Sequence, residues 1–104
     1  MYFIDPYTKP IDKINSLQHW ILVQSIIYYK FDTNITTDYK YDMNCNLLVR
    51  LQNKFRSSKK KSRYYYIFKD FDGSTGFDLI YKLNGKDYNR LMQKAEYLVK
   101  KFGG

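Results

Sequence analysis

One stretch with helical spacing, residues 11–29, most constrains what this chain can fold into. It contains neither glycine nor proline, and its apolar residues recur near the helical repeat. The residues that carry this repeat are Ile14, Leu17, Ile21 and Tyr28. Pro10 suits the first turn of a helix, where its missing N–H costs nothing. The pattern predicts a helix from about Ile11 to Tyr29, followed by a polar break at residues 31–37 (FDTNITT).

A second helical pattern follows that break and runs to about residue 55. Its members, at intervals of three and four, are Tyr41, Cys45, Leu48, Gln52 and Phe55. Thr37 is placed to cap this helix, and the helix dipole favours Asp38 in the first turn. Because the connection is short, we expect the two helices to form an antiparallel hairpin over residues 10–56.

The character of the sequence changes after the second helix. The segments RYYYIFKDF (63–71) and FDLIYKL (77–83) are rich in aromatic and branched residues and flank DGSTG (72–76). This arrangement predicts an antiparallel β-hairpin.

The last segment, from residue 84 onward, predicts a helix with an apolar face wide enough to cover a sheet. That face consists of Tyr88, Leu91, Met92, Ala95, Leu98, Val99 and Phe102. Asn84 is the predicted cap, with Asp87 three residues on and Leu83 and Tyr88 placed as a hydrophobic staple. Gly103 is the predicted stop.

Together these elements predict an α+β fold with the order α-α-β-β-α. At 104 residues the chain is long enough for one core and too short for two, so we expect a single domain. Within it the helical hairpin occupies residues 10–56, a basic loop residues 57–63, and the β-hairpin with the final helix residues 64–104. A short strand at residues 1–4 (MYFI) is a further option.

Positive charge is concentrated in one segment. The chain has 18 Lys and Arg against 10 Asp and Glu, a net charge of +8. Five of the basic side chains lie in RSSKKKSR (56–63), and without them the net charge would be +3. They are Arg56, Lys59, Lys60, Lys61 and Arg63. We expect an exposed basic loop that is either a solvated turn or a surface attracting acidic proteins or phosphate backbones.

The single cysteine and the absence of long apolar runs bear on location. Cys45 cannot form an internal disulfide, which favours a reducing compartment. No apolar run approaches the roughly 20 residues of a membrane span. The first ten residues lack the basic start and apolar centre of a signal peptide. We therefore expect a cytoplasmic protein with no membrane partner.

The segment YYKFDTNITTDYKYD (28–42) gathers tyrosines and aspartates around the break between the two helices. Three of them share one helix face at i, i+3 and i+4, and two end the first helix across the loop. The five are Tyr28, Tyr29, Asp38, Tyr41 and Asp42. Such a notch suits a flat cationic ring stacked on tyrosine, or a ribose whose hydroxyls donate to carboxylates. The spacing equally fits tyrosines that pack between helices and aspartates that serve as capping charges.

Residues 28–52 (YYKFDTNITTDYKYDMNCNLLVRLQ) resemble the N-terminal helical domain of bacterial NAD-dependent DNA ligases. In that family a helix-loop-helix carries a Tyr, a Tyr or His, a loop Asp, and then Asp-x-x-Tyr-Asp. Every interval from residue 28 to residue 42 agrees without a gap. The family commonly has His where this chain has Tyr29, and Leu where it has Asn44. The resemblance covers roughly residues 10–55.

The resemblance implies a domain that holds the nicotinamide mononucleotide half of NAD, with tyrosines against the nicotinamide and aspartates making polar contacts. Carried over residue by residue, these roles fall on Tyr28, Tyr29, Asp38, Tyr41 and Asp42. The ligase catalytic domain, with its Lys-x-Asp-Gly nucleophile, needs far more than 104 residues, and in KDFDG (69–73) the lysine is one residue too far away. We expect no enzyme activity and no required cofactor, with NAD or nicotinamide mononucleotide as a ligand. No metal site is expected, because neither His19 nor Cys45 is placed to complete one.

Three functions remain open from the sequence. The first is a stand-alone, non-catalytic phage or mobile-element protein that sequesters or senses NAD or a related nucleotide, or modulates a host enzyme. The second is a phage inhibitor, of anti-defence or anti-CRISPR type, that binds a host nucleic-acid enzyme through the basic loop and surface tyrosines. The third is direct binding of DNA or RNA by residues 59–63, with residues 64–66 (YYY) stacking on bases. In a strand Tyr64 and Tyr66 would share one face and Tyr65 would lie on the other, which limits the stacking surface.

Overall fold

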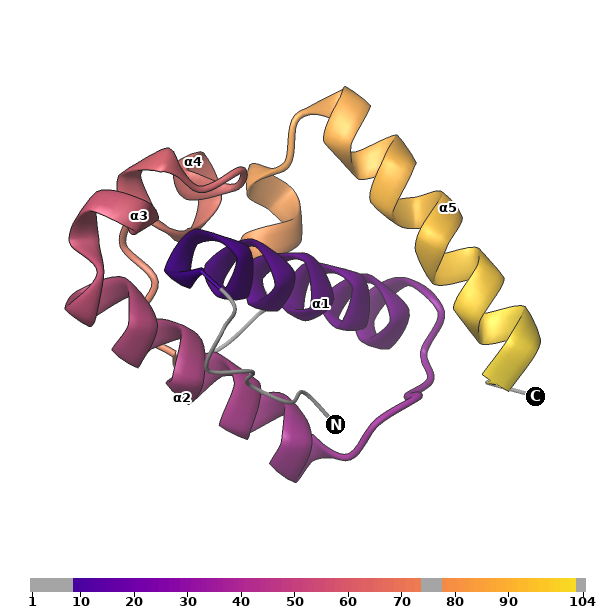
Figure 1. Ribbon diagram of the computed structural model, residues 1–104. Helices are drawn as coiled ribbons and strands as arrows, with labels where there is room; N and C mark the ends of the chain where they lie inside the picture. The colour runs from indigo at the N-terminus through magenta and orange to yellow at the C-terminus, as the bar shows by residue number, and fades with distance from the viewer. Residues whose placement is uncertain (1–8, 74–77, 103–104) are drawn as a thin grey trace.

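The computed structural model describes residues 9–73 and 78–102, and every regular element in these ranges is helical (Figure 1). In chain order the elements are α1 (Pro10–Lys30), α2 (Asp38–Lys54), α3 (Arg56–Lys61), α4 (Tyr65–Phe68), the 3-10 helix η1 (Leu79–Lys82) and α5 (Gly85–Phe102). None of the helices in these ranges is long and apolar enough to cross a bilayer.

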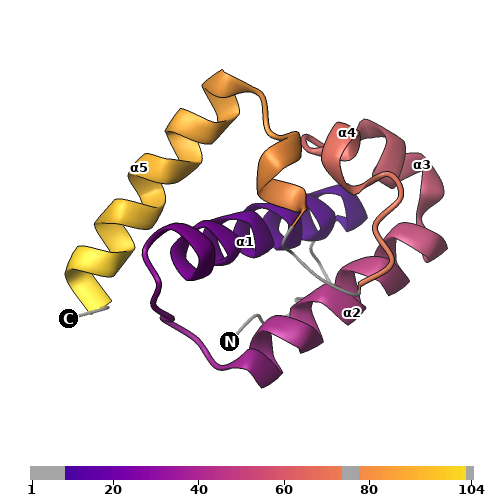
Figure 2. The same cartoon turned by 180° about the vertical axis from the view of Figure 1, so that it is seen from behind.

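Helix α1 lies at the centre of the molecule because it is apolar around most of its circumference. Ile21, Leu22 and Val23 are consecutive and have no exposed surface, so no side of the helix faces solvent at this level. Helices α2, α3, η1 and α5 all pack against α1. Figure 2, the view from behind, shows the same central position.

The predicted helical hairpin is present, since α2 runs back along α1 after the connection at residues 31–37. The predicted cap is also confirmed. The Thr37 hydroxyl oxygen accepts the backbone N–H of Lys40 at 3.1 Å, satisfying one of the free donors of the first turn. Cap and connection together fix where α2 begins, and hence which residues of α2 face the end of α1.

The predicted α+β fold with an antiparallel β-hairpin is wrong, because α4 and η1 occupy the segments expected to be strands. Tyr64, Ile67 and Phe68 are buried while Tyr66 is exposed, which is the i, i+3, i+4 pattern of a helix face rather than the alternation of a strand. Strand propensity depends strongly on packing, and here packing overrides it. Most of the predicted turn (residues 74–76), the optional strand at residues 1–4 and Gly103 lie outside the described residues.

A buried hydrogen-bond network holds the short helices against the hairpin. The Gln18 side-chain nitrogen donates to Gln52 Oε1 at 3.1 Å and to Ser62 Oγ at 2.9 Å. Gln18 Oε1 accepts the backbone N–H of Tyr64 at 3.1 Å, and Gln52 Nε2 donates to the Phe68 carbonyl at 3.3 Å. The network therefore ties α1 and α2 to both ends of α4, using backbone groups that a β-ladder would have needed.

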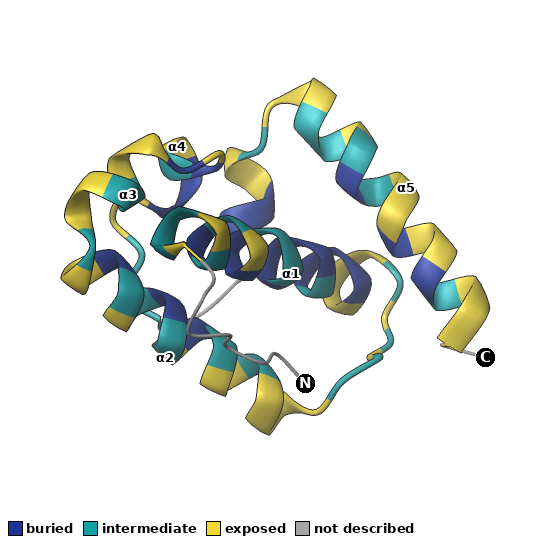
Figure 3. Ribbon diagram, in the orientation of Figure 1, coloured by how far each residue is buried: buried dark blue, intermediate teal, exposed yellow. Residues whose placement is uncertain are grey.

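Helix α5 covers α1 rather than a sheet. Leu91, Ala95 and Leu98 are buried against the core, as Figure 3 shows by the dark face of this helix. Phe102, the last residue of the predicted apolar face, is 64% exposed because it lies beyond the packed part of the helix. The predicted cap is confirmed, with the Asp87 N–H donating to Asn84 Oδ1 at 2.8 Å.

A polar cluster joins α4 to the start of α5. The Tyr66 hydroxyl donates to Asp87 Oδ2 at 2.6 Å, and Arg90 pairs with Asp87 Oδ1 at 2.9 Å. Arg90 also donates to the Tyr64 hydroxyl oxygen. The hydrogen bond from Tyr66, followed by those from Arg90, holds the pKa of Asp87 below its usual value.

Candidate functional site

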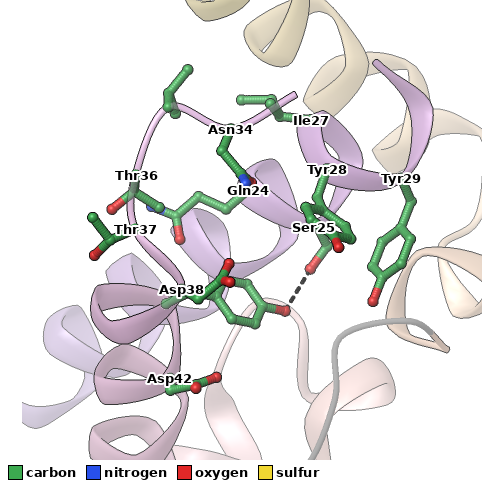
Figure 4. A pocket seen from close by; sticks show the side chains of 12 residues that line it. Gln24, Ser25, Ile27, Tyr28, Tyr29, Asn34, Thr36, Thr37, Asp38 and Asp42 are labelled. Carbon is green, nitrogen blue, oxygen red and sulfur yellow. Dashed lines mark hydrogen bonds between the residues drawn. The ribbon is translucent and has the colours of Figure 1, made fainter. Parts of the chain in front are cut away.

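A cavity of about 310 Å³ opens where the end of α1 faces the start of α2 (Figure 4). Its wall is formed by five residues of α1, by residues 34–37 of the connection and by three residues from the first two turns of α2. Among them are Tyr28, Tyr29, Asp38, Tyr41 and Asp42. The structure therefore brings together all five residues singled out from the sequence. The volume lies at the lower end of the roughly 300–1,000 Å³ found for small-molecule sites.

Tyr28 and Tyr29 present open aromatic surface to this cavity. Their rings meet edge to face, with centroids 4.8 Å apart and planes 83° apart. Tyr28 is 49% exposed and Tyr29 38% exposed, so neither ring is sandwiched between the helices. A flat ligand can therefore reach both rings, in the offset or edge-on geometries that aromatic groups prefer.

Tyr41 has a different environment. Ser25 Oγ lies 2.7 Å from the Ile21 carbonyl, to which it donates its single proton. The Tyr41 hydroxyl, 2.9 Å from the same Ser25 oxygen and joined to it by the dashed line in Figure 4, must therefore be the donor of that bond. Burial raises the pKa of Tyr41 well above its usual value, which keeps it protonated. Tyr41 is thus packed and held in a fixed orientation. This is what the alternative interpretation, tyrosines that pack between the helices, predicted for every tyrosine of the site.

Asp38 and Asp42 lie one turn apart on α2 and are both exposed. Among the residues that the structure describes, neither carboxylate has a hydrogen bond or an ion pair. The cap of α2 is provided by the Thr37 side chain, so neither aspartate is needed for it. Two uncompensated carboxylates beside open tyrosine rings can attract a cationic ring and accept hydrogen bonds from hydroxyl groups.

Sequence reasoning missed three lining residues on α1: Gln24, Ser25 and Ile27. Gln24 Oε1 is buried and has no hydrogen-bond partner in the part of the chain that the structure describes, although a buried acceptor normally finds one. Ser25 orients Tyr41 as described above. The sequence does hold a pattern that could have indicated Gln24 and Ser25. They are adjacent polar residues that interrupt the apolar run WILVQSII (20–27).

His19 and Cys45 do not line the cavity. Cys45 is a free, buried thiol, and burial raises its pKa to about 12. His19 lies partly buried on α1, where desolvation and then the charge of Lys94 lower its pKa. Within the described part of the chain, no group of three or more His, Cys, Asp or Glu side chains is arranged to hold a metal ion.

The basic segment lies at the other end of α2 from the cavity (Figure 1). It is not the loop that the sequence predicted, because residues 56–61 form helix α3. Lys59 donates to the Lys69 carbonyl at 2.7 Å and is half-buried, and the remaining four side chains are exposed. The exposed four are Arg56, Lys60, Lys61 and Arg63.

The base-stacking surface predicted beside this segment is not formed. Tyr64 is only 1% exposed and lies in the core, whereas Tyr66 is exposed and hydrogen-bonded to Asp87. The two rings do not share a face, because the segment is helical rather than extended. The prediction that bases stack on Tyr64 and Tyr66 is therefore wrong.

Comparison of the chain with known protein families, with curated proteins and with solved structures found no match.

Proposed function

We propose that this chain is a non-catalytic protein that binds NAD or nicotinamide mononucleotide in the cavity between α1 and α2, and so sequesters or senses the nucleotide. The observation that supports the proposal is that five residues from one ungapped pattern line a single cavity: Tyr28, Tyr29, Asp38, Tyr41 and Asp42. A phage or mobile-element source is part of this proposal.

The chemistry of the lining matches that of nicotinamide nucleosides. The nicotinamide ring is flat and positively charged, so it can stack on the exposed rings of Tyr28 and Tyr29. The same charge is attracted by the carboxylates of Asp38 and Asp42, which also accept hydrogen bonds from ribose hydroxyls. Tyr41, fixed by Ser25, gives the cavity a rigid aromatic wall.

Binding without catalysis is proposed because the hydroxyls of Ser25 and Tyr41 in the cavity are committed to structure. The Ser25 proton is donated to the Ile21 carbonyl and its oxygen accepts from Tyr41, so no base is available to activate it as a nucleophile. We also propose a cytoplasmic location, in which the buried thiol of Cys45 stays reduced.

Calorimetric titration with nicotinamide mononucleotide tests this proposal. Asp42→Ala removes a charged acceptor, and since a hydrogen bond to a charged group contributes about 1.5–3 kcal/mol, we expect the affinity to fall roughly 10- to 100-fold. Asp70→Ala, a change at an exposed aspartate outside the cavity, is the matched control and should leave the affinity unchanged. Absence of binding heat with the unmodified protein, at millimolar ligand, would contradict the proposal.

A second candidate function is contact with an acidic host protein or nucleoprotein complex. It is favoured by a segregation of charge, since residues 43–69 contain eight Lys and Arg and no Asp or Glu. Reversing Lys60 and Lys61 to Glu should remove such a partner from a pull-down with host lysate. An unchanged set of retained partners would show that these side chains only face solvent.

A further inference from the structure

A second cavity, of about 760 Å³, lies along the neighbouring face of α2. Three of its lining residues, Gln24, Ile35 and Thr36, also line the first cavity. The two cavities therefore meet at these residues, where α1 and the connection to α2 come together.

The two cavities differ in charge. Counting only the residues that the structure describes, the first is lined by Asp38 and Asp42 and by no Lys or Arg, whereas the second is lined by Lys40 and Arg50 and by no acidic residue. The second also has apolar surface from Trp20, which is partly buried, and from residues on α2. Those residues are Tyr39, which is 73% exposed, and Met43, which is 46% exposed.

We propose that the two cavities together hold one intact dinucleotide, with the nicotinamide riboside in the first cavity and the adenosine in the second. This inference rests on the proposed function of the first cavity and names its ligand as NAD rather than the mononucleotide. Lys40 lies in the first turn of α2 and lines the second cavity together with the shared residue Thr36, so its charge is available to the pyrophosphate. Tyr39, Met43 and Trp20 supply the surface on which a flat adenine stacks.

The junction itself contains an unmet hydrogen-bonding group. Gln24 lines both cavities, and its buried Oε1 has no hydrogen-bond partner among the residues that the structure describes. To accept a hydrogen bond from a ligand this oxygen must turn out toward a cavity, where a ribose hydroxyl supplies the donor and a phosphate does not. A dinucleotide that crosses the junction carries a ribose on each side of its pyrophosphate, so it brings a donor to this place.

Single-stranded nucleic acid is the other ligand class that uses aromatic and basic side chains along a groove. It fits this arrangement less well, because a continuing phosphate chain would have to pass Asp38 and Asp42. A dinucleotide instead places its positively charged ring there and its two phosphates beside Lys40. The opposite charges of the two cavities thus favour the dinucleotide.

The inference is tested by comparing NAD with nicotinamide mononucleotide in calorimetry. We expect the unmodified protein to bind NAD at least tenfold more tightly. Tyr39→Ala should lower the NAD affinity about tenfold and change the mononucleotide affinity less than twofold, because only the dinucleotide reaches Tyr39. Lys40→Glu should weaken both ligands, since each carries a phosphate. Tyr97→Ala, at an exposed tyrosine of α5 that lines neither cavity, is the matched control and should change neither affinity.

Equal affinity for the two nucleotides, with no effect of Tyr39→Ala, would overturn this inference and leave the proposed function of the first cavity intact. Absence of binding by either nucleotide would overturn both. Tighter binding of a ten-residue oligothymidylate than of NAD, with the same dependence on Tyr39, would overturn the inference in favour of single-stranded nucleic acid.

Discussion

Tyr41 differs from Tyr28 and Tyr29 in how deeply it is packed. It donates to Ser25, which in turn donates to the Ile21 carbonyl, so it is the outermost member of a short chain of hydrogen bonds rooted in α1. Tyr28 and Tyr29 are exposed at the rim of the same cavity. Of these three tyrosines, Tyr41 thus shapes the cavity, whereas Tyr28 and Tyr29 keep exposed ring surface at its rim.

This division predicts different costs for removing the hydroxyls. Tyr41→Phe should lower the free energy of unfolding by about 0.5–1.5 kcal/mol, the usual net value of one hydrogen bond. Tyr28→Phe, at an exposed position, should change it by less than about 0.5 kcal/mol. Urea denaturation of the two variants measures the difference. If both variants lost the same free energy of unfolding, the Tyr41–Ser25 hydrogen bond would not be what holds Tyr41 in place.

The spacing of residues 28–42 was sufficient to predict which side chains meet, because helix geometry and a short connection determine it. It was not sufficient to predict which tyrosine is buried. That depends on Ser25, a residue in the preceding turns of α1 whose role becomes visible only when α2 lies beside it. The unpaired Gln24 acceptor was invisible from the sequence for the same reason.

At the scale of elements, the short helices α3 and α4 exist because the hairpin supplies their buried polar partners. A helix of six or four residues is not stable alone, since nucleation costs more than so few hydrogen bonds return. The missing stability comes from hydrogen bonds of the Gln18 and Gln52 side chains to Ser62, to the Tyr64 N–H and to the Phe68 carbonyl. The aromatic and branched residues of this segment predicted a strand, although Tyr64, Ile67 and Phe68 also fall at helical spacing. The glutamines, 34 residues apart, are not paired by any local pattern that could have corrected this prediction.

Gln18→Met tests this dependence, because methionine has a similar size and cannot replace the three hydrogen bonds of the amide. Each buried group left without a partner costs about 1–3 kcal/mol, so we expect the free energy of unfolding to fall by at least about 2 kcal/mol. Gln93→Met, on the exposed face of α5, is the matched control. Similar stabilities of the two variants in urea would contradict the role assigned to the network.

The link between α4 and α5 predicts a pH dependence. The hydrogen bond from Tyr66 and the contacts of Arg90 lower the pKa of Asp87 in the folded protein. A lowered pKa means that the stabilisation is present above the unfolded value, about 3.9 for aspartate, and is lost as the pH falls through the lower folded value. Thermal unfolding followed from pH 6 to pH 2 should therefore show a steeper acid loss for the unmodified protein than for Asp87→Asn. Parallel pH profiles would contradict the link.

At the scale of the whole molecule, a single apolar helix organises two surfaces of opposite charge. Helix α1 packs on α2, α3, η1 and α5, and its last turn forms one wall of the acidic cavity. The basic segment lies at the far end of α2, about 25 Å away along a 17-residue helix. A nucleotide that enters the cavity by its cationic ring is therefore held by local groups, whereas an anion attracted only by net charge would collect at α3. This separation makes the two proposed functions distinguishable by position.

The most direct measurement is a titration with nicotinamide mononucleotide followed by backbone amide chemical shifts in ¹H–¹⁵N NMR spectra. The account predicts saturable shifts at Tyr28, Tyr29, Asp38 and Asp42, with the amides of Lys60 and Lys61 unchanged. Shifts confined to α3, or no shifts around the cavity at millimolar ligand, would contradict the claim that the mouth of the α1–α2 hairpin is a nucleotide site.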